Sequence, residues 1–328
     1  MAEKLVFHFE GALSDEHKMN FYEAARFQYA AARLMVKLAQ FRATGSFVKN
    51  ITYKSNFGIL LDSQNDGSFN INTSSPTPEE GDKTFADLSM ADLLAYISER
   101  LVEKGDEAAL IASVNARRKV AGSKTDTIAE TLADADVVVS AIAADPAARN
   151  ALGPDARDAV ERRIAEMDRE DRLVARRSEI SKIDAPREQK LISMSAPLVS
   201  EMAISLRRSA STLRVVAPDE DRRQSVLYLN RRMAQEIETA KVDREITPIL
   251  CDIVQYNKES GWGKVRLENS VDPIVSFSIP SDLKSSLQGL LMDQMKKDKV
   301  YVQAYFVRDK ANVPTRLIVV GILATPHE

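Results

Sequence analysis

Cysteine and histidine are scarce in this chain of 328 residues. There is one cysteine, Cys251, and there are three histidines, at positions 8, 17 and 327. A single cysteine excludes a disulfide framework and a zinc site built from thiolates, because each of these needs at least two. Three histidines that are scattered along the sequence do not suggest a metal site with histidine ligands. We therefore predict no metal and no cofactor, and the lone Cys251 fits a reducing compartment.

Long apolar runs are also missing. The longest, such as Val137–Ala144, are far shorter than the roughly 20 residues of a membrane-spanning helix. The first residues, MAEKLVFHFEG, mix charge with a short apolar run and lack the apolar core of a signal peptide. We expect a cytoplasmic protein without a membrane partner.

The patterns typical of catalysis and of phosphate binding are absent. There is no P-loop and no G-x-S-x-G nucleophile elbow. The segment Gly261–Lys264 lacks the third glycine of the dinucleotide fingerprint and lies between expected strands, which indicates a hairpin turn. We therefore predict no catalytic residues. A polar pocket around His8 or His17 would be the observation that favours an enzyme.

The overall composition is that of a folded protein, with 44% hydrophobic residues, 28% charged residues and a net charge of -3. The length suits two or three domains. Residues 149–244 carry 20 basic and 17 acidic residues, too even a balance for a dedicated DNA-binding domain. We predict an α+β protein with three parts: an α/β head over 1–82, a helical region over 83–244 and an OB-like five-stranded barrel over 245–328.

The head is predicted to have the order β-α-β-β-β. Lys4–Phe9 alternates like a strand, and a helical pattern runs from Ser14 to about Thr44, where Gly45 would end it. Three strands are expected next: Phe47–Tyr53, Gly58–Asp62 and Ser68–Asn72. One stripe of the helix combines apolar and small side chains, which favours close packing on the sheet: Phe21, Ala25, Gln28, Ala32, Met35 and Ala39.

The helical region contains a highly charged helix, predicted over Asp155–Ile183. Its apolar positions form only a thin stripe: Val160, Ile164, Met167, Val174 and Ile180. We interpret it as a solvated connector about 43 Å long at the standard helical rise. The alternative is an arm that docks a partner or self-associates. Because a helix of this length cannot rest wholly on one small domain, we expect a homodimer, formed through this helix or through the head. Further along, Thr212–Val216 and Ser225–Leu229 are expected to pair as strands.

The C-terminal region is predicted to have the order β-β-β-α-β-β, with a helix over Ser281–Lys297 between the third and fourth strands. This is the order of an OB-type barrel. An SH3-like barrel is the main alternative, but a helix of five turns at this place is unusual for it. Alternation along the strands predicts the residues that face inward: Val265, Leu267, Val275, Phe277, Ile279, Val302, Ala304 and Phe306.

A set of aromatic and cationic residues is expected outside the barrel core: Trp262, Lys264, Arg266, Tyr301, Tyr305 and Arg308. Aromatic rings stack on bases and cations hold phosphates, so these residues suit single-stranded nucleic acid. The same residue types mark protein interfaces, and the region has no net charge to attract nucleic acid. We predict a protein partner first, with nucleic acid and packing against the rest of the chain as alternatives.

Several segments resemble a group of bacterial proteins without an assigned activity. They are FHFEG near the start, AARFQYAAARL in the long helix, DGSFNI and YNKESGWGKVRL. In that group an α/β N-terminal domain is joined by helices to a small C-terminal barrel. The resemblance covers most of the chain, and its motifs look structural. It implies a bacterial cytosolic protein that is one part of a multi-gene system, with antiphage defence as one setting.

No catalytic pattern accompanies the predicted binding-type barrel. The sequence therefore predicts a non-enzymatic interaction or scaffold protein. The alternative is a module that binds single-stranded nucleic acid through the barrel. An enzyme of unknown type is a third hypothesis, since α/β domains and barrels host many activities.

Overall fold

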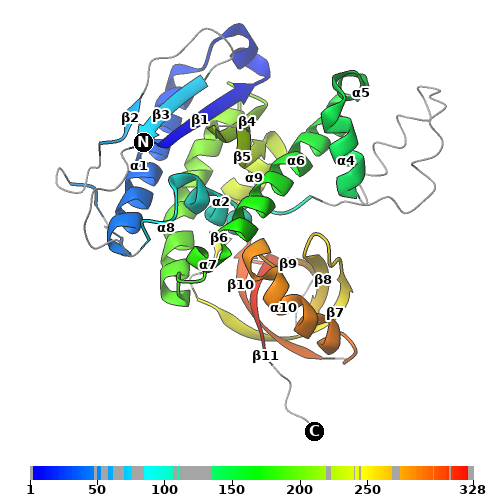
Figure 1. Cartoon of the computed structure of the whole chain (residues 1–328). Coiled ribbons are helices and arrows are strands. Elements are labelled where there is room, and N and C mark those ends of the chain that lie inside the picture. The colour runs from blue at the N-terminus through cyan, green and yellow to red at the C-terminus, as the bar shows by residue number, and fades with distance from the viewer. Residues whose placement is uncertain are drawn as a thin grey trace.

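Figure 1 shows a computed structural model of the whole chain. The structure describes residues 3–47, 50–52, 58–61, 70–75, 85–105, 110, 135–218, 223–239, 241–243, 245–267, 274–297, 299–309 and 312–323. It is a mixed α+β protein. A sheet with its helices forms the upper part of Figure 1, called the head below, and the C-terminal region forms a closed five-stranded barrel in the lower part.

The head sheet has the strand order β2-β3-β1-β4-β5, and all neighbouring strands are antiparallel. The bounds are β1 (Glu3–Glu10), β2 (Leu60–Leu61), β3 (Asn70–Ser75), β4 (Thr212–Pro218) and β5 (Arg223–Asn230). The predicted pairing of β4 with β5 is confirmed. Because β4 also pairs with β1, a hairpin far along the chain completes the sheet. The strand expected over Phe47–Tyr53 lies partly outside the described residues.

The long helix of the head, α1 (Phe21–Thr44), begins later than predicted. It starts after Asn20, whose side chain accepts hydrogen bonds from two backbone N–H groups of the first turn. Ser14, the predicted start, lies in a short 3₁₀ helix, η1 (Ala12–Glu16). Gly45 ends α1 as predicted, because its φ of 63° is a left-handed conformation that glycine adopts at little cost.

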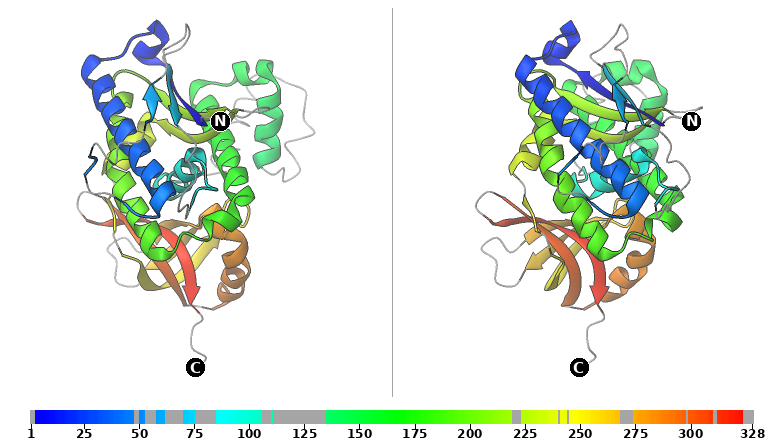
Figure 2. Two further views of the ribbon diagram at one scale, coloured as in Figure 1. Left: turned by 60° about the vertical axis from the view of Figure 1, so that its left-hand side comes forward. Right: turned by 90° about the vertical axis from the view of Figure 1, so that its left-hand side faces the viewer.

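The side of α1 that packs on the sheet is not the predicted stripe. The buried side consists of larger residues, Phe27, Leu34, Leu38 and Phe41. Of the predicted stripe, only Met35 is fully buried, and these residues are exposed: Phe21, Ala25, Gln28 and Ala32. The prediction was wrong because the larger apolar side chains on the neighbouring stripe remove more apolar area from water. Figure 2, right, shows α1 on the outside of the molecule.

The other described helices lie around this sheet and between it and the barrel (Figure 1). Their bounds are α2 (Met90–Leu101), α4 (Ala135–Ala144), α5 (Pro146–Ala151), α6 (Pro154–Ala175), α7 (Arg177–Ile180), α8 (Ala185–Ala203), η3 (Ile204–Leu206) and α9 (Arg231–Thr239). The helix α6 runs from α5 past the sheet towards the barrel (Figure 1).

The interpretation of α6 as a solvated connector was wrong. The helix ends at Ala175, and much of its charge is buried: Glu161, Arg162, Arg163, Glu166, Asp168 and Arg169. The reason is that each of these side chains forms a hydrogen bond or an ion pair with a group outside α6. The first residue of the predicted apolar stripe, Val160, packs against Val139 and Ile142 of α4. Ile164 and Met167 pack against the same cluster and Ile180 is buried, so most of the stripe is used within the chain, whereas Val174 is exposed.

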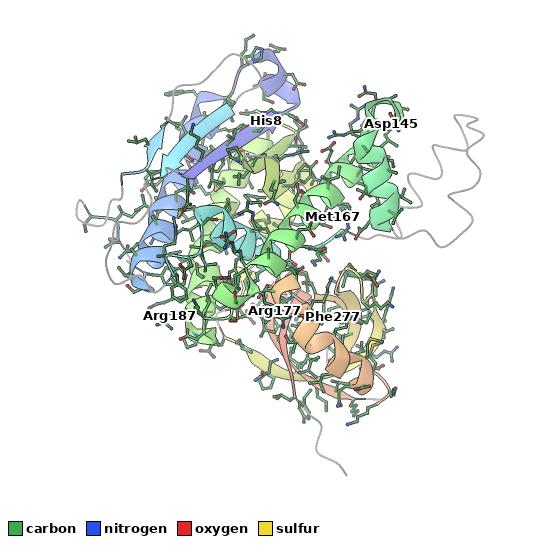
Figure 3. The ribbon with its side chains drawn as sticks, in the orientation of Figure 1. His8, Asp145, Met167, Arg177, Arg187 and Phe277 are labelled. Atoms are coloured by element: carbon green, nitrogen blue, oxygen red, sulfur yellow. The ribbon has the colours of Figure 1, made fainter. Side chains whose placement is uncertain are left out.

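The barrel consists of β7 (Thr247–Tyr256), β8 (Trp262–Leu267), β9 (Ile274–Ser278), β10 (Val300–Arg308) and β11 (Pro314–Leu323), with α10 (Ser281–Gln294) between β9 and β10. The short strand β6 (Lys241–Val242) extends the sheet beside β10. Pairing of β10 with β11 closes the barrel, and β9 and β11 are parallel. This arrangement is consistent with an OB-like fold. The residues predicted to face inward belong to the buried barrel core, including Phe277, which Figure 3 labels, except Phe306, which is partly buried against it.

Gly263 on β8 leaves no room for a side chain. A Cβ atom there would lie 2.4 Å from the backbone oxygen of Gln255 and 2.4 Å from Cε1 of Phe277. We expect Gly263→Ala to lower the free energy of unfolding by about 1–3 kcal/mol, the usual cost of overpacking. Urea unfolding would measure this change as a lower midpoint. Gly289 on α10 is the matched control, because a Cβ there has nothing within 4 Å. Equal losses in the two alanine variants would contradict the prediction.

Candidate functional site

The barrel meets the head through buried charges, which we call the interface ion cluster. The cluster joins the C-terminal end of α2 and the N-terminal end of α10 to α6 and α8. None of its side chains belongs to a residue more than 7% exposed, and its members are Glu99, Arg100, Lys104, Arg169, Glu188 and Asp282. Charges buried to this degree are stable only when each has a close partner.

Arg100 is the centre of one half of the cluster. Its guanidinium forms two parallel hydrogen bonds to the carboxylate of Asp282, of 3.1 and 2.8 Å. Its Nε donates to Glu188 on α8, which also accepts a hydrogen bond of 2.8 Å from the hydroxyl of Tyr96. The guanidinium carbon lies 3.5 Å from the centre of the Tyr96 ring. Burial raises the pKa of Tyr96 well above its usual value, so its hydroxyl stays a donor.

Glu99 is the centre of the other half. Its carboxylate lies 3.0 Å from Nζ of Lys104 and accepts a hydrogen bond of 2.7 Å from Nε of Arg169. It also accepts hydrogen bonds from the backbone N–H and the hydroxyl of Ser281, the first residue of α10. Burial would raise the pKa of Glu99, but Lys104 and Arg169 more than offset this and hold the pKa well below its usual value.

The interface ion cluster fixes the barrel to the head. Lys104 adds a hydrogen bond of 2.8 Å to the backbone oxygen of Ser260, in the turn before β8. Apolar packing acts at the same interface, because the outward-facing Tyr305, Val307 and Ile318 of the barrel belong to the core of the head. The two parts therefore present their free surfaces in one fixed geometry.

The outer side of β8 carries three of the predicted binding residues in one row. Trp262 is half-buried, and Lys264 and Arg266 are exposed. Nζ of Lys264 lies 5.5 Å from the centre of the Trp262 ring. Arg266 is already paired with Asp252 on β7, at 2.9 Å. Only part of the predicted positive charge is therefore available to a ligand.

The other three predicted residues lie apart from this row. Tyr301 on β10 is 36% exposed and is separated from β8 by β7. Tyr305 faces out of the barrel as predicted but is fully buried against the head, so an external ligand does not reach it. Arg308 is paired with Asp243 at 2.9 Å and lies over the ring of Phe306. The structure thus does not bring the six predicted residues together into one site.

A surface that the sequence reasoning missed lies on α1. We call it the α1 aromatic face, and it consists of Phe21, Tyr22, Ala25, Gln28, Tyr29 and Ala32, all exposed. Phe21 is 89% exposed, Tyr22 62% and Tyr29 61%. The guanidinium of Arg26 lies over the Tyr22 ring and that of Arg33 over the Tyr29 ring. Arg26 is held from the other side by Glu201 of α8 at 2.7 Å.

The sequence does contain a pattern that would have identified this face. Tyr22, Ala25, Tyr29 and Ala32 follow one another at spacings of three, four and three residues. This is the spacing of the seam of a coiled coil. The pattern was overlooked because Ala25 and Ala32 also belong to the stripe that begins at Phe21, which was expected to pack on the sheet.

Other kinds of site find little support in the described part of the chain. Among those residues, no group of three or more histidine, cysteine, aspartate or glutamate side chains is placed to hold a metal ion. None of the described helices combines the length and apolar character needed to cross a membrane. No protein-family model, curated protein or solved structure matches the chain.

Proposed function

We propose that this protein is a non-enzymatic interaction protein that assembles as a homodimer through the α1 aromatic face. The observation that carries the proposal is the exposure of Phe21, Tyr22 and Tyr29 on one helix. At about 150–250 Å² for a whole aromatic side chain, these rings leave on the order of 400 Å² in water. A patch of this size is comparable to the largest one on a typical monomer, and such patches are often functional. They supply roughly half of the 800 Å² that each partner buries in a standard interface.

A second copy of the chain fits this face by size. In an antiparallel pair of α1 helices related by a two-fold axis, Tyr22 of one copy would face Ala32 of the other, and Ala25 would face Tyr29. Each layer then combines one large and one small side chain, which is the knobs-into-holes arrangement. The same register brings Phe21 opposite Arg33, a cation–π pairing. A parallel pair would instead place tyrosine on tyrosine and leave a gap between alanines.

The outer barrel face is the second proposed contact surface, for a different protein partner. Trp262, Lys264 and Tyr301 remain accessible there, and the interface ion cluster holds them in a fixed position relative to α1. Single-stranded nucleic acid as the partner has less support, because Arg266 and Arg308 are paired with carboxylates. The resemblance of the sequence supports a bacterial cytoplasmic setting and a role as one part of a multi-gene system, for which antiphage defence is the proposed example.

We expect Ala32→Glu to convert the dimer into a monomer. The carboxylate would face Tyr22 of the other copy and would lose its water on association, which is costly for an unpaired charge. Light scattering over a concentration series up to tens of micromolar would report the mass. Ala141→Glu, on the exposed side of α4, is the matched control and should leave the dimer intact. A wild-type protein that is monomeric throughout this range would refute the proposal.

Cysteine cross-linking tests the register of the pair. The native Cys251 is buried, so it does not interfere with engineered thiols. Mixing the Tyr22→Cys and Ala32→Cys chains under oxidising conditions should give a covalent dimer, because the antiparallel register brings these two positions together. Either variant alone should give much less. Efficient cross-linking of Tyr22→Cys with itself would exclude the antiparallel arrangement.

A further inference from the structure

The face of the head sheet that α6 covers is polar at one end, beside the apolar pair Val6–Val216. On β1, β4 and β5 the positions on this side form two cross-strand rows, His8–Arg214–Tyr228 and Glu10–Thr212–Asn230. The opposite side carries the apolar residues that pack on α1, such as Phe9, Leu213 and Leu229. A sheet face covered by a helix ordinarily buries apolar side chains, and buried polar groups reduce stability unless they are hydrogen-bonded. The polar side chains of these two rows therefore need hydrogen-bond partners on the elements that cover them.

The first turns of α6 supply acidic partners for this face. Asp158 accepts hydrogen bonds from the hydroxyl of Tyr228 and, at 2.7 Å, from the amide of Asn230. Glu161 accepts from Arg214 and from Arg149 of α5. These hydrogen bonds and ion pairs hold the polar side chains of the sheet and of α6 in place. The same side chains border the cavity that is described below.

On β1, in the same cross-strand row as Asn230, the side chain of Glu10 is hydrogen-bonded to that of His8 at 2.8 Å. Figure 3 labels His8 on β1. The hydrogen bond from His8 is the main cause that lowers the pKa of Glu10, so its carboxylate is charged at neutral pH. His17 lies at the end of η1, and neither His8 nor His17 is among the residues that line the cavity described next.

A cavity of about 570 Å³ opens beside these residues, between the end of the sheet and the first turns of α6. Its volume lies in the usual range for small-molecule sites, about 300–1,000 Å³. Its lining comes from β1, β4, β5, α6 and the start of α9, and includes Glu10, Asp155, Arg157, Ser211, Thr212 and Arg231. Elements distant in sequence thus converge on one hollow, whose lining combines carboxylates and guanidinium groups with apolar surface.

Two arginines that line the cavity use only part of the hydrogen-bonding capacity of their guanidinium groups. Arg157 of α6 makes one hydrogen bond, of 3.2 Å, to the backbone oxygen of Asn150. Arg231 of α9 makes one, of 3.4 Å, to the backbone oxygen of Ala210. Within the described part of the chain, neither forms an ion pair with a carboxylate. Two guanidinium groups from different helices suit a group with two negative charges, such as a phosphate monoester.

The N-terminus of α6 adds to this preference. Gly153 precedes the helix and no side chain caps its N-terminus, whose first residues, Pro154 and Asp155, line the cavity. The positive end of a 22-residue helix favours an anion. On the strand side of the cavity, the exposed carboxylate of Glu10 and the hydroxyls of Ser211 and Thr212 are suited to the hydroxyl groups of a sugar.

We propose that this cavity binds a sugar phosphate, with the phosphate between Arg157, Arg231 and the N-terminus of α6, and the sugar hydroxyls against Glu10 and Thr212. The binding site is separate from the α1 aromatic face, which lies on the opposite side of the sheet. The ligand is either a free sugar phosphate or the same group within a nucleotide.

Calorimetric titration of the full chain with ribose 5-phosphate tests the proposal. We expect saturable binding, and a loss of about tenfold in affinity in Arg157→Gln and in Arg231→Gln, the size expected for one charge-assisted contact. Both arginines are exposed, so the variants should fold, and circular dichroism would check this. Arg177→Gln on α7, labelled in Figure 3, is the matched control outside the cavity and should bind like the wild type.

Three further probes identify which part of the ligand is recognised. Ribose without phosphate should not bind. Inorganic phosphate should bind more weakly than ribose 5-phosphate, because it lacks the sugar hydroxyls. Tighter binding of adenosine 5′-monophosphate would assign the site to a nucleotide, and equal or weaker binding would assign it to a free sugar phosphate. The absence of binding by either sugar phosphate at millimolar concentration would overturn the proposal, and so would wild-type affinity in both the Arg157→Gln and the Arg231→Gln variant. Phosphate that binds as tightly as ribose 5-phosphate would also overturn it.

Discussion

Replacing Arg100 with alanine is expected to lower the free energy of unfolding by about 3–5 kcal/mol, the usual cost of removing one partner from a buried ion pair. The substitution leaves the carboxylates of Asp282 and Glu188 buried without their guanidinium. It also removes a side chain that is only 1% exposed and packs on the Tyr96 ring. Urea unfolding followed by circular dichroism would measure the loss.

Two comparisons separate the role of the charge from that of the side chain. Arg177→Ala, at an exposed position on α7, should change the stability by less than about 0.5 kcal/mol. The triple variant Arg100→Met, Glu188→Leu, Asp282→Leu should recover much of the loss, because it removes the buried carboxylates together with their partner. If Arg100→Ala were as stable as Arg177→Ala, the interface ion cluster would not hold the barrel on the head.

The barrel could be predicted from the sequence because its determinants are local. Alternation along β8, β9 and β10 specifies which side chains face inward, and short turns separate the strands. The helix between β9 and β10 then distinguishes an OB-type order from an SH3-like one. Each of these features is read within a few residues, so no knowledge of distant partners is needed.

The face of α1 could not be decided in the same way. Two adjacent stripes have the same period, and which one is buried depends on the total area that each removes from water. Phe27 and Phe41 decide the outcome, because they contact Phe9 and Phe85 from other parts of the chain. A helical period identifies candidate faces but does not rank them when both contain apolar residues.

The role of α6 was unpredictable for a related reason. Its charges resemble those of a solvated helix because pairs at helical spacing are available within it. In the structure, Arg169 pairs with Glu99, and Arg172 with Asp92 on α2. Partners at this distance along the chain leave no trace in local sequence. The cavity beside α6 depends on the same long-range contacts, and His8 is hydrogen-bonded to Glu10 of its lining without being part of it, so no local pattern identified the cavity.

Acid is expected to destabilise the protein steeply below about pH 4.5, through the buried carboxylates at the head–barrel interface. Burial would raise the pKa of Glu99, but Lys104 and Arg169 hold it below the ordinary value of 4.5, and Arg162 and Arg163 do the same for Glu166. A carboxyl group whose pKa is lower in the folded state stabilises the fold above its unfolded pKa. This contribution is lost as the pH falls below 4.5 towards the folded pKa. Urea unfolding at a series of pH values would measure it.

The variant Glu99→Gln isolates one carboxylate from this dependence. Each proton that the unfolded state binds in excess contributes about 1.4 kcal/mol per pH unit to the slope of stability against pH. Removing Glu99 should therefore reduce the slope between about pH 3 and pH 4.5 by up to this amount, whatever the variant does to stability at pH 7. Glu236 on α9 is the contrasting control, because burial, with Glu103 nearby, raises its pKa above 4.5. The contribution of Glu236 to the free energy of unfolding is present below pH 4.5 and is lost as the pH rises. Glu236→Gln should therefore leave the slope of stability against pH unchanged in the acid range. Identical acid slopes for the wild type and Glu99→Gln would show that Glu99 is not held ionised by Lys104 and Arg169.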